Sequence, residues 1–521
     1  MREGFANQMS HSNHSHKLHW GAAFTINLVI GVAFAFFAQW LPSSEGAKRI
    51  VTRIWGPVVT QTYPATGRDQ VTVMLIDDLD LRQYEEMWPV SLGFHQRRLQ
   101  HLLKYGPKAV FFDIAFLDDR RDPDLDGFID TACRARQQGV PVFIGSFANA
   151  GLTPSRVETE MLKRRVEVQG KSLPCIEAAY LNLKIDGFDQ SVWEYDVGLP
   201  EGSQDGHEAE HGRHADAVRY PSPAARLYAI DHQLDKEVLE EPMALVWGMK
   251  TDPFNLSWMR NDEHDVGTGR PCAANWSMWR VLPFGKMGPP LCPYQRTLPL
   301  RTLNLANGLD AGGLHKALAG KYVIYGTHLQ STADTITTPY HGRVAGAYLH
   351  AMALDNLLSF EGRPRRAGEF AEPGSGAVTA FTLFALVVIC GFIAVKERVS
   401  PRLKKGSDEA RSASHGIADK DHVEPTAWRR LKGLLRAIGR SLRSRLVPGL
   451  MFGTAALAVV FLLIYVSYEV LELGPMVWVE YALFPLGAHF LHIGEKIEEA
   501  FAWMLMQWKG GHEDEESVKT A

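Results

Sequence analysis

The sequence predicts an α/β domain with a mainly parallel sheet and flanking helices, held between transmembrane helices. Residues 22–40 and 377–395 are apolar stretches without Lys, Arg, Asp or Glu, and each approaches the ~20 residues with which a helix spans a bilayer. Between them, short runs that are apolar on both faces alternate with helical patterns. That alternation is typical of strands buried in a parallel sheet.

A third charge-free stretch, residues 450–468, predicts a multi-pass protein. Residues 396–445 carry 14 Lys/Arg against 6 Asp/Glu, so this loop is expected in the cytoplasm and the large domain outside. The predicted order is a cytoplasmic tail (1–20), a transmembrane signal anchor (21–41), the external domain (42–372), a second transmembrane helix (376–395), a basic loop (396–447), a third transmembrane helix (449–469), a fourth span or interfacial helix (475–508) and an acidic tail (509–521).

The first predicted strand covers residues 71–76 and stops at Asp77 and Asp78. Ser91 then opens a helical pattern that stops at Gly106, since glycine readily ends a helix. A second apolar run, residues 109–112, ends in Asp113. Together these elements predict a strand, helix and strand of a βαβ unit.

The same pattern continues with a helix over residues 125–138 and a strand over 141–144. Far downstream, residues 321–325 predict another strand and residues 347–360 a helix that leads back to the membrane. Between 149 and 300 the periodicity is poor. The clearest element there is a helix over 222–232, with Ser222 as its cap and Pro223 at its first position.

Charge and cysteine content narrow the class of protein. A net charge of −4 gives no overall basic field, so we expect no nucleic-acid partner. Four of the five cysteines fall in the external domain, where two disulfides with three alternative pairings, or buried free thiols, are both compatible with the sequence. The four candidates are Cys133, Cys175, Cys272 and Cys292.

The predicted cytoplasmic loop contains a basic amphipathic pattern that indicates a binding surface. Residues 428–442 place Trp, Leu and Ile at helical spacing with Arg and Lys between them. Such a basic amphipathic helix lies on anionic lipid or docks a protein partner. Residues 396–445 are therefore the predicted contact with a cytoplasmic or membrane signalling partner, beside the lipid bilayer itself.

Polar residues follow three of the predicted strands. In an open parallel sheet, loops converge and ligands bind at the carboxyl ends of the strands. The candidate ligand-binding residues, which would hold a cation or hydrogen-bond a polar ligand, are Asp77, Asp78, Asp113, Thr327 and Asp334. The alternative is structural, because an aspartate at a strand end often caps the following helix or turn.

His207-Glu-Ala-Glu-His211 matches the H-E-x-x-H zinc-protease pattern, and His214 offers a third ligand. The pattern lies in a polar stretch without apolar periodicity, whereas a zinc protease carries it on a packed helix. A solvated loop is the favoured interpretation. We therefore expect no cofactor, and a metal-dependent hydrolase ranks last among the hypotheses.

Several landmarks occur in a specific order and spacing: Ile76-Asp77-Asp78, Trp88-Pro89, Phe112-Asp113-Ile114-Ala115-Phe116, Tyr322-Val-Ile-Tyr-Gly326, Asp334, Pro339, Gly346 and His350-Ala351. Together they resemble the CHASE-two family, the extracellular sensory domain associated with bacterial cyclases and histidine kinases. The resemblance covers about residues 45–372 and is weak in the middle. Val90 and Ser91 depart from the aromatic and basic residues that commonly follow the Trp-Pro pair in the family.

The resemblance implies a bacterial inner-membrane sensor, not an enzyme. Family members usually carry a kinase or cyclase after the last span, whereas about 50 residues follow the third span here, without a P-loop or kinase signature. We expect the signal to pass to a separate partner, with a homo-oligomer as one assembly. The alternative is a non-signalling scaffold subunit of an envelope complex.

Overall fold

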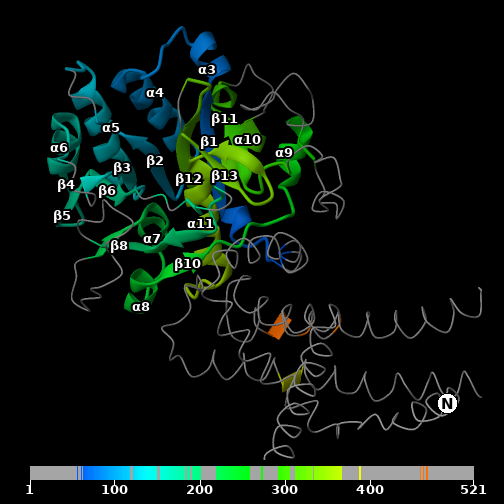
Figure 1. Ribbon diagram of the computed structural model, residues 1–521. Coiled ribbons are helices and arrows are strands. Elements are labelled where there is room, and N and C mark those ends of the chain that lie inside the picture. Colours follow the sequence, from blue (N-terminus) through cyan, green and yellow to red (C-terminus); the bar gives the residue numbers. More distant parts are fainter. Residues whose placement is uncertain are drawn as a thin grey trace, which may run out of the picture. The chain divides into compact units, whose positions relative to one another are not determined.

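The computed structural model describes residues 63–365, except 118–120, 149–152, 182, 184, 188–189, 201–218, 259–271, 274–290, 305–310 and 332–333, together with residues 56, 60, 387–388, 458, 462 and 465–466. One of the two compact units of the chain comprises residues 49–370 and 467–477 and holds nearly all described residues (Figure 1). None of the described helices is long and apolar enough to cross a membrane. The three stretches predicted as spans lie almost wholly outside the described residues and stay a prediction.

A six-stranded parallel sheet forms the centre of the domain (Figure 1). Its strands, in spatial order, are β11 (Arg296–Pro299), β1 (Val71–Asp77), β12 (Tyr322–His328), β2 (Ala109–Ala115), β3 (Val142–Ser146) and β6 (Ile176–Tyr180). The described helices are α3 (Asp78–Gln83), α4 (Leu92–Leu103), α5 (Leu125–Gln137), α6 (Arg156–Lys163), α7 (Pro223–Tyr228), α8 (Lys236–Glu240), α9 (Pro253–Trp258), α10 (Ala311–Leu318) and α11 (Ala347–Ser359), with 3-10 turns at Arg68–Gln70 and Leu300–Leu303. The predicted α/β fold with a mainly parallel sheet is confirmed.

The predicted elements match the observed ones within a few residues. The Oγ of Ser91 accepts a hydrogen bond from the Phe94 amide at 3.2 Å and caps α4, as its sequence position predicts. The chain leaves α4 and α5 through Gly106 and Gly139, which adopt φ values of 59° and 82°. Those positive values favour glycine and explain why both helical patterns end there.

The order of the strands differs from their order in the chain. β12 lies between β1 and β2, pairing with β1 from Tyr322 to His328 and with β2 from Tyr322 to Tyr325. The strands of the first βαβ unit, β1 and β2, are therefore not neighbours, because β12 lies between them. Residues near 77, 113 and 327 consequently share one edge.

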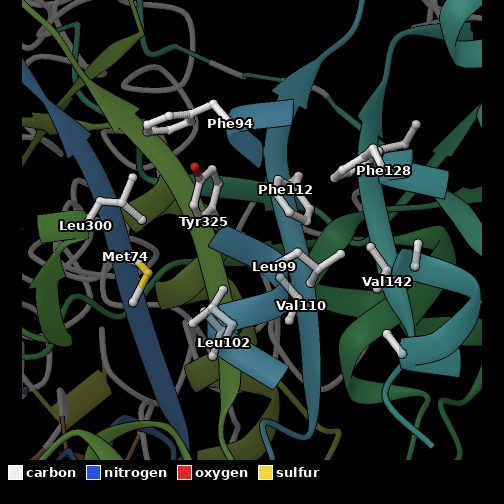
Figure 2. Packing of buried hydrophobic residues seen from close by; sticks show 14 of the residues in the cluster. Met74, Phe94, Leu99, Leu102, Val110, Phe112, Phe128, Val142, Leu300 and Tyr325 are labelled. Atoms are coloured by element: carbon white, nitrogen blue, oxygen red, sulfur yellow. The ribbon is translucent and has the colours of Figure 1, made fainter. Parts of the chain in front are cut away.

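One face of the sheet is covered by α4 and α5, which pack against each other. Leu99 and Leu102 of α4 and Phe128 of α5 are fully buried against the sheet (Figure 2). Phe112 of β2 makes ring contacts with Tyr325 and Phe128, with centroids 4.8 and 5.5 Å apart. This aromatic cluster is the centre of the main hydrophobic core.

Helix α11 packs on β1 and β12 and against α7. Every residue from 347 to 358 is buried, so this helix is covered on all sides, whereas an amphipathic helix buries one face. Its buried polar side chains form hydrogen bonds with neighbouring elements. The Asn356 side chain, for example, accepts from the Val246 amide at 3.0 Å and donates to the Val246 carbonyl at 3.1 Å.

In the region from 149 to 300, where periodicity is poor, the described residues form three two-stranded antiparallel sheets besides β6, β11 and short helices. Their strands are too short for an alternating pattern to be visible in sequence. The pairs are β4 (Arg165–Val168) with β5 (Lys171–Pro174), β7 (Glu194–Asp196) with β10 (Pro242–Ala244), and β8 (Gly198–Pro200) with β9 (Arg219–Pro221), to which β13 (Thr335–Thr338) with β14 (Gly342–Ala345) adds a fourth later in the chain. The helix predicted over 222–232 is shorter, but Ser222 caps it as expected.

Two disulfides are present, and they distinguish among the three pairings that the sequence allows. Cys133 of α5 is joined to Cys175, one residue before β6, and Cys272 is joined to Cys292 before β11. Each bridge closes a loop, of sequence separation 42 and 20. Both bridges therefore restrict the unfolded chain.

The disulfides are expected to contribute measurably to stability. Replacing Cys133 and Cys175 together by Ala should lower the free energy of unfolding by about 2–4 kcal/mol, because the unfolded chain regains loop entropy. Denaturant unfolding of the purified protein, followed by tryptophan fluorescence, measures this. Reductant breaks both bridges, so it should destabilise the wild type at least as much and leave a variant without these four cysteines unaffected. An unchanged wild type under reductant would contradict the prediction.

Candidate functional site

Parallel pairing brings the carboxyl ends of β1, β2 and β12 to one edge of the sheet. Gly326 and Asp113 follow the last paired residues of β12 and β2, and a Cβ added to Gly326 would be 3.6 Å from the Cβ of Asp113. Thr327 follows directly, and Asp334 lies on the loop beyond β12. Of the five predicted ligand-binding residues, these three (Asp113, Thr327 and Asp334) come together.

The carboxyl groups of Asp113 and Asp334 both lie close to Gly346, the residue directly before α11. A Cβ added to Gly346 would overlap Oδ1 of Asp334 and lie 3.7 Å from Oδ2 of Asp113. The Thr327 hydroxyl donates to Oδ2 of Asp334 at 3.0 Å. The absence of a side chain at residue 346 thus permits two acids to approach each other beside the start of a helix.

His350 completes this cluster from α11. Its Nε2 lies 3.4 Å from Oδ1 of Asp113, and its Nδ1 lies 3.0 Å from the Tyr195 hydroxyl. The ring of His350 also packs edge-on against Phe111, with centroids 5.5 Å apart. A polar chain therefore runs from β2 through α11 to β7, and Asp113, Thr327, Asp334, His350 and Tyr195 are called the acid cluster below.

The site prediction missed His350 and Tyr195. His350 was visible as one of the landmarks of the family resemblance, four residues after Gly346, although it does not follow a strand. Tyr195 lies in the region of poor periodicity, and no local pattern marks it. Only the tertiary contact with His350 identifies it.

Burial governs the electrostatics of the acid cluster. Burial, followed by the nearby charge of Asp113, raises the pKa of Asp334 to about 6, against the opposing effects of Thr327 and His350. The Asp113 side chain is 7% exposed, and its Oδ2 has no hydrogen-bond partner among the described residues. An open carboxylate oxygen beside a second acid can receive a cationic or hydrogen-bond-donating group.

Asp77 has a structural role instead. Its carboxylate accepts from the Asp80 amide at 2.8 Å, and Asp80 accepts from the Asp77 amide at 3.0 Å, forming a capping box at the start of α3. Arg301 contacts both acids, with Nη1 2.5 Å from Asp77 and 3.5 Å from Asp80. Burial, followed by the charge of Asp77, raises the pKa of Asp80 to about 7. The alternative structural interpretation therefore describes Asp77.

Asp78 also ties backbone segments together. Its Oδ2 accepts from the amide of Gln330 at 3.1 Å, which links α3 to the loop after β12. The bond is exposed, and Asp78 belongs to neither the acid cluster nor the Arg301 contact. It stays a ligand-binding candidate by position alone.

The metal candidates are not placed by the structure. His207, His211 and His214 lie outside the described residues. Within the described part of the chain, no group of three or more His, Cys, Asp or Glu side chains is arranged to hold a metal ion.

Comparison with known proteins identifies the domain. The CHASE2 domain family matches residues 30–391, more than half of the chain, and the match extends into both flanking apolar stretches. The chain belongs to the CHASE2 domain family. CHASE2 domains are extracellular sensory domains, so the resemblance inferred from the sequence is confirmed and a sensor role is supported. No curated protein and no solved structure matches the chain.

Asp334 should make stability depend on pH in a defined window. Its folded pKa of about 6 exceeds the ~3.9 of an unfolded aspartate, so the native state holds the proton more tightly. The stabilisation is complete below pH 4 and is lost as pH rises to about 6. Relative to Asp334→Asn, the wild type should lose about 2 kcal/mol of unfolding free energy across that window. Parallel pH curves of unfolding for the two proteins would contradict this.

Arg301→Ala should be strongly destabilising, because it leaves two buried acids without their cation. The expected loss is about 3–5 kcal/mol at pH 8, and less at pH 5, where Asp80, with its raised pKa, holds a proton. Arg97→Ala is the matched control, since Arg97 pairs with Glu86 at the surface with 57% of its side chain exposed. That variant should lose less than about 0.5 kcal/mol in the same denaturant titration. Equal losses for the two variants would refute the structural role of Arg301.

Proposed function

We propose that the protein is a membrane-anchored sensor that receives a stimulus at the acid cluster and passes it to a separate partner. The observation that carries this is the contact of Asp113 with His350, because His350 lies on α11, the last described helix before residues 377–395. A change at the sheet edge therefore acts directly on the helix that leads out of the domain. The CHASE2 membership supports a sensory role for this domain.

The stimulus would act by changing the charge balance around Asp113. A ligand that satisfies the open Oδ2 of Asp113 removes a desolvation cost and alters the contact with His350. Since α11 is buried along its length, it responds by shifting as a packed unit. Two packings of α11, one favoured by ligand, would suffice to transmit the signal.

Membrane anchoring rests on the sequence. The two charge-free stretches flank the domain, and the basic loop 396–447 places the domain on the external side.

The output is proposed to come from another chain that docks at residues 396–445. The amphipathic pattern of 428–442 presents basic side chains beside an apolar stripe, as partner-binding and lipid-binding helices do. In this proposal the protein is a receptor and not an enzyme, and a homo-oligomer of it is compatible with this role. The competing function is a scaffold that holds envelope proteins in a fixed complex.

Cross-linking in native membranes, followed by mass spectrometry of what co-purifies with the tagged full-length protein, tests the proposal. A kinase, cyclase or other cytoplasmic regulator should be recovered. Replacing Arg429, Arg430, Arg436 and Arg440 by Gln should reduce its yield at least several-fold. Recovery of envelope proteins alone would favour the scaffold.

The acid cluster is tested in the same assay. Asp113→Ala should change the output of the recovered partner or the yield of its complex, while a thermal melt shows that the domain stays folded. Asp126→Ala is the matched control and should behave as the wild type, because the Asp126 side chain is 85% exposed and lies outside the acid cluster. A folded Asp113→Ala protein with unchanged yield and output would remove the acid cluster from the mechanism.

A further inference from the structure

The first and last described segments of the domain meet at one buried carboxyl group. Asp355 lies in the last turns of α11 and is fully buried. The Tyr63 hydroxyl donates to its Oδ1 at 2.6 Å, although the two residues are 292 positions apart. The Ser359 hydroxyl donates to the same oxygen at 3.0 Å.

Packing reinforces this contact. The Tyr63 ring lies edge-on to both Tyr294 and Phe360, with centroids 5.8 and 5.6 Å apart. The amide of Gly67 donates to the Ser359 hydroxyl at 3.3 Å. A Cβ at Gly67 would lie 2.6 Å from Oδ1 of Asp355, so glycine is needed for the two segments to approach this closely.

The carboxyl group of Asp355 is only partly satisfied. Its Oδ2 is buried and has no hydrogen-bond partner among the described residues. Burial raises the pKa of Asp355 to about 7, and the hydrogen bonds from Tyr63 and Ser359, together with the charge of Arg68, oppose the increase only in part. Ionisation of Asp355 would thus leave a buried negative charge whose Oδ2 accepts no hydrogen bond, and this costs free energy.

Other titratable groups near α11 hydrogen-bond or pair with residues other than Asp355. Tyr294 donates to the Pro64 carbonyl, Arg68 pairs with Asp69, Tyr322 donates to Asp231, and Arg226 lies near Glu177. Of these groups, Arg68 favours ionisation of Asp355 and Asp69 opposes it. The direct hydrogen bonds to Asp355 in the described structure come from Tyr63 and Ser359.

We propose that Tyr63, Asp355 and Ser359 form a proton-controlled clasp, which holds the two ends of the domain together while Asp355 is neutral and weakens when Asp355 ionises. The clasp would make the coupling between these ends respond to the pH of the compartment that holds the domain. This proposal depends neither on the acid cluster nor on the identity of a signalling partner. It concerns a different carboxyl group, at the other end of α11 from His350.

The direction of the effect follows from linkage. Opening the clasp exposes Asp355, whose pKa then returns to about 3.9, whereas the closed clasp holds its proton up to about pH 7. Opening therefore releases a proton between these values and becomes about tenfold more favourable per pH unit. Above pH 7 both states are ionised, and the dependence levels off.

Hydrogen exchange with mass spectrometry on the full-length protein in detergent tests the clasp between pH 5 and pH 8. After correction for intrinsic exchange, protection of residues 63–70 and 355–362 should fall by up to about tenfold per pH unit from pH 5 to 7 and then level off. Peptides from β12, at the centre of the sheet, serve as the internal reference. Protection that is independent of pH in both segments would overturn the proposal.

Two variants separate a clasp from a contact that is only structural. Asp355→Asn keeps an acceptor for Tyr63 and Ser359 but cannot titrate, so protection in both segments should become independent of pH. Tyr63→Phe keeps the ring and removes a donor that favours the ionised form, so protection should fall at every pH and level off at a higher pH. Wild-type pH dependence in Asp355→Asn, or an unshifted curve in a folded Tyr63→Phe protein, would refute proton control by Asp355.

Discussion

β12 pairs with β1 along seven residues and with β2 along four, and this double ladder places the last strand of the sheet at its centre. The remaining architecture depends on that pairing. It brings Gly326 against Asp113 and carries the following loop, with Asp334, to the same edge. It also directs α11 across β1 and β12, where His350 reaches Asp113. The acid cluster thus exists because the chain returns to the middle of its own sheet.

Burial of acids is the second theme of this domain. Asp80, Asp334 and Asp355 all have raised pKa values for the same first cause, removal of the carboxylate from water. Their surroundings differ. Asp80 has Arg301 as a cation, Asp334 has a second acid and a histidine, and Asp355 has two hydroxyl donors. One physical effect therefore yields a structural ion pair, a candidate stimulus site and a proposed clasp.

Helix α11 connects the acid cluster with the proposed clasp. His350 near its start contacts the acid cluster, and Asp355 near its end contacts the first described segment of the domain. A sensory domain needs a body that links its stimulus site to the segments that leave it. A helix buried on all sides suits that task, because close packing lets it shift as a unit and resists local bending. The CHASE2 membership and this arrangement thus support the same functional class.

Local sequence determined most of the elements of this fold. Runs apolar on both faces defined β1, β2, β3 and β12, and Ser91, Gly106 and Gly139 fixed helix ends through hydrogen-bonding and backbone preferences that need no distant partner. Tertiary structure alone decided the strand order, the disulfide pairing and the roles of the aspartates. Asp77 and Asp113 look alike in sequence, since each follows an apolar run, yet Asp77, which caps α3, pairs with Arg301, whereas Asp113 contacts His350. Those partners lie more than 200 residues away, and the contacts depend on a sheet order that no local pattern encodes.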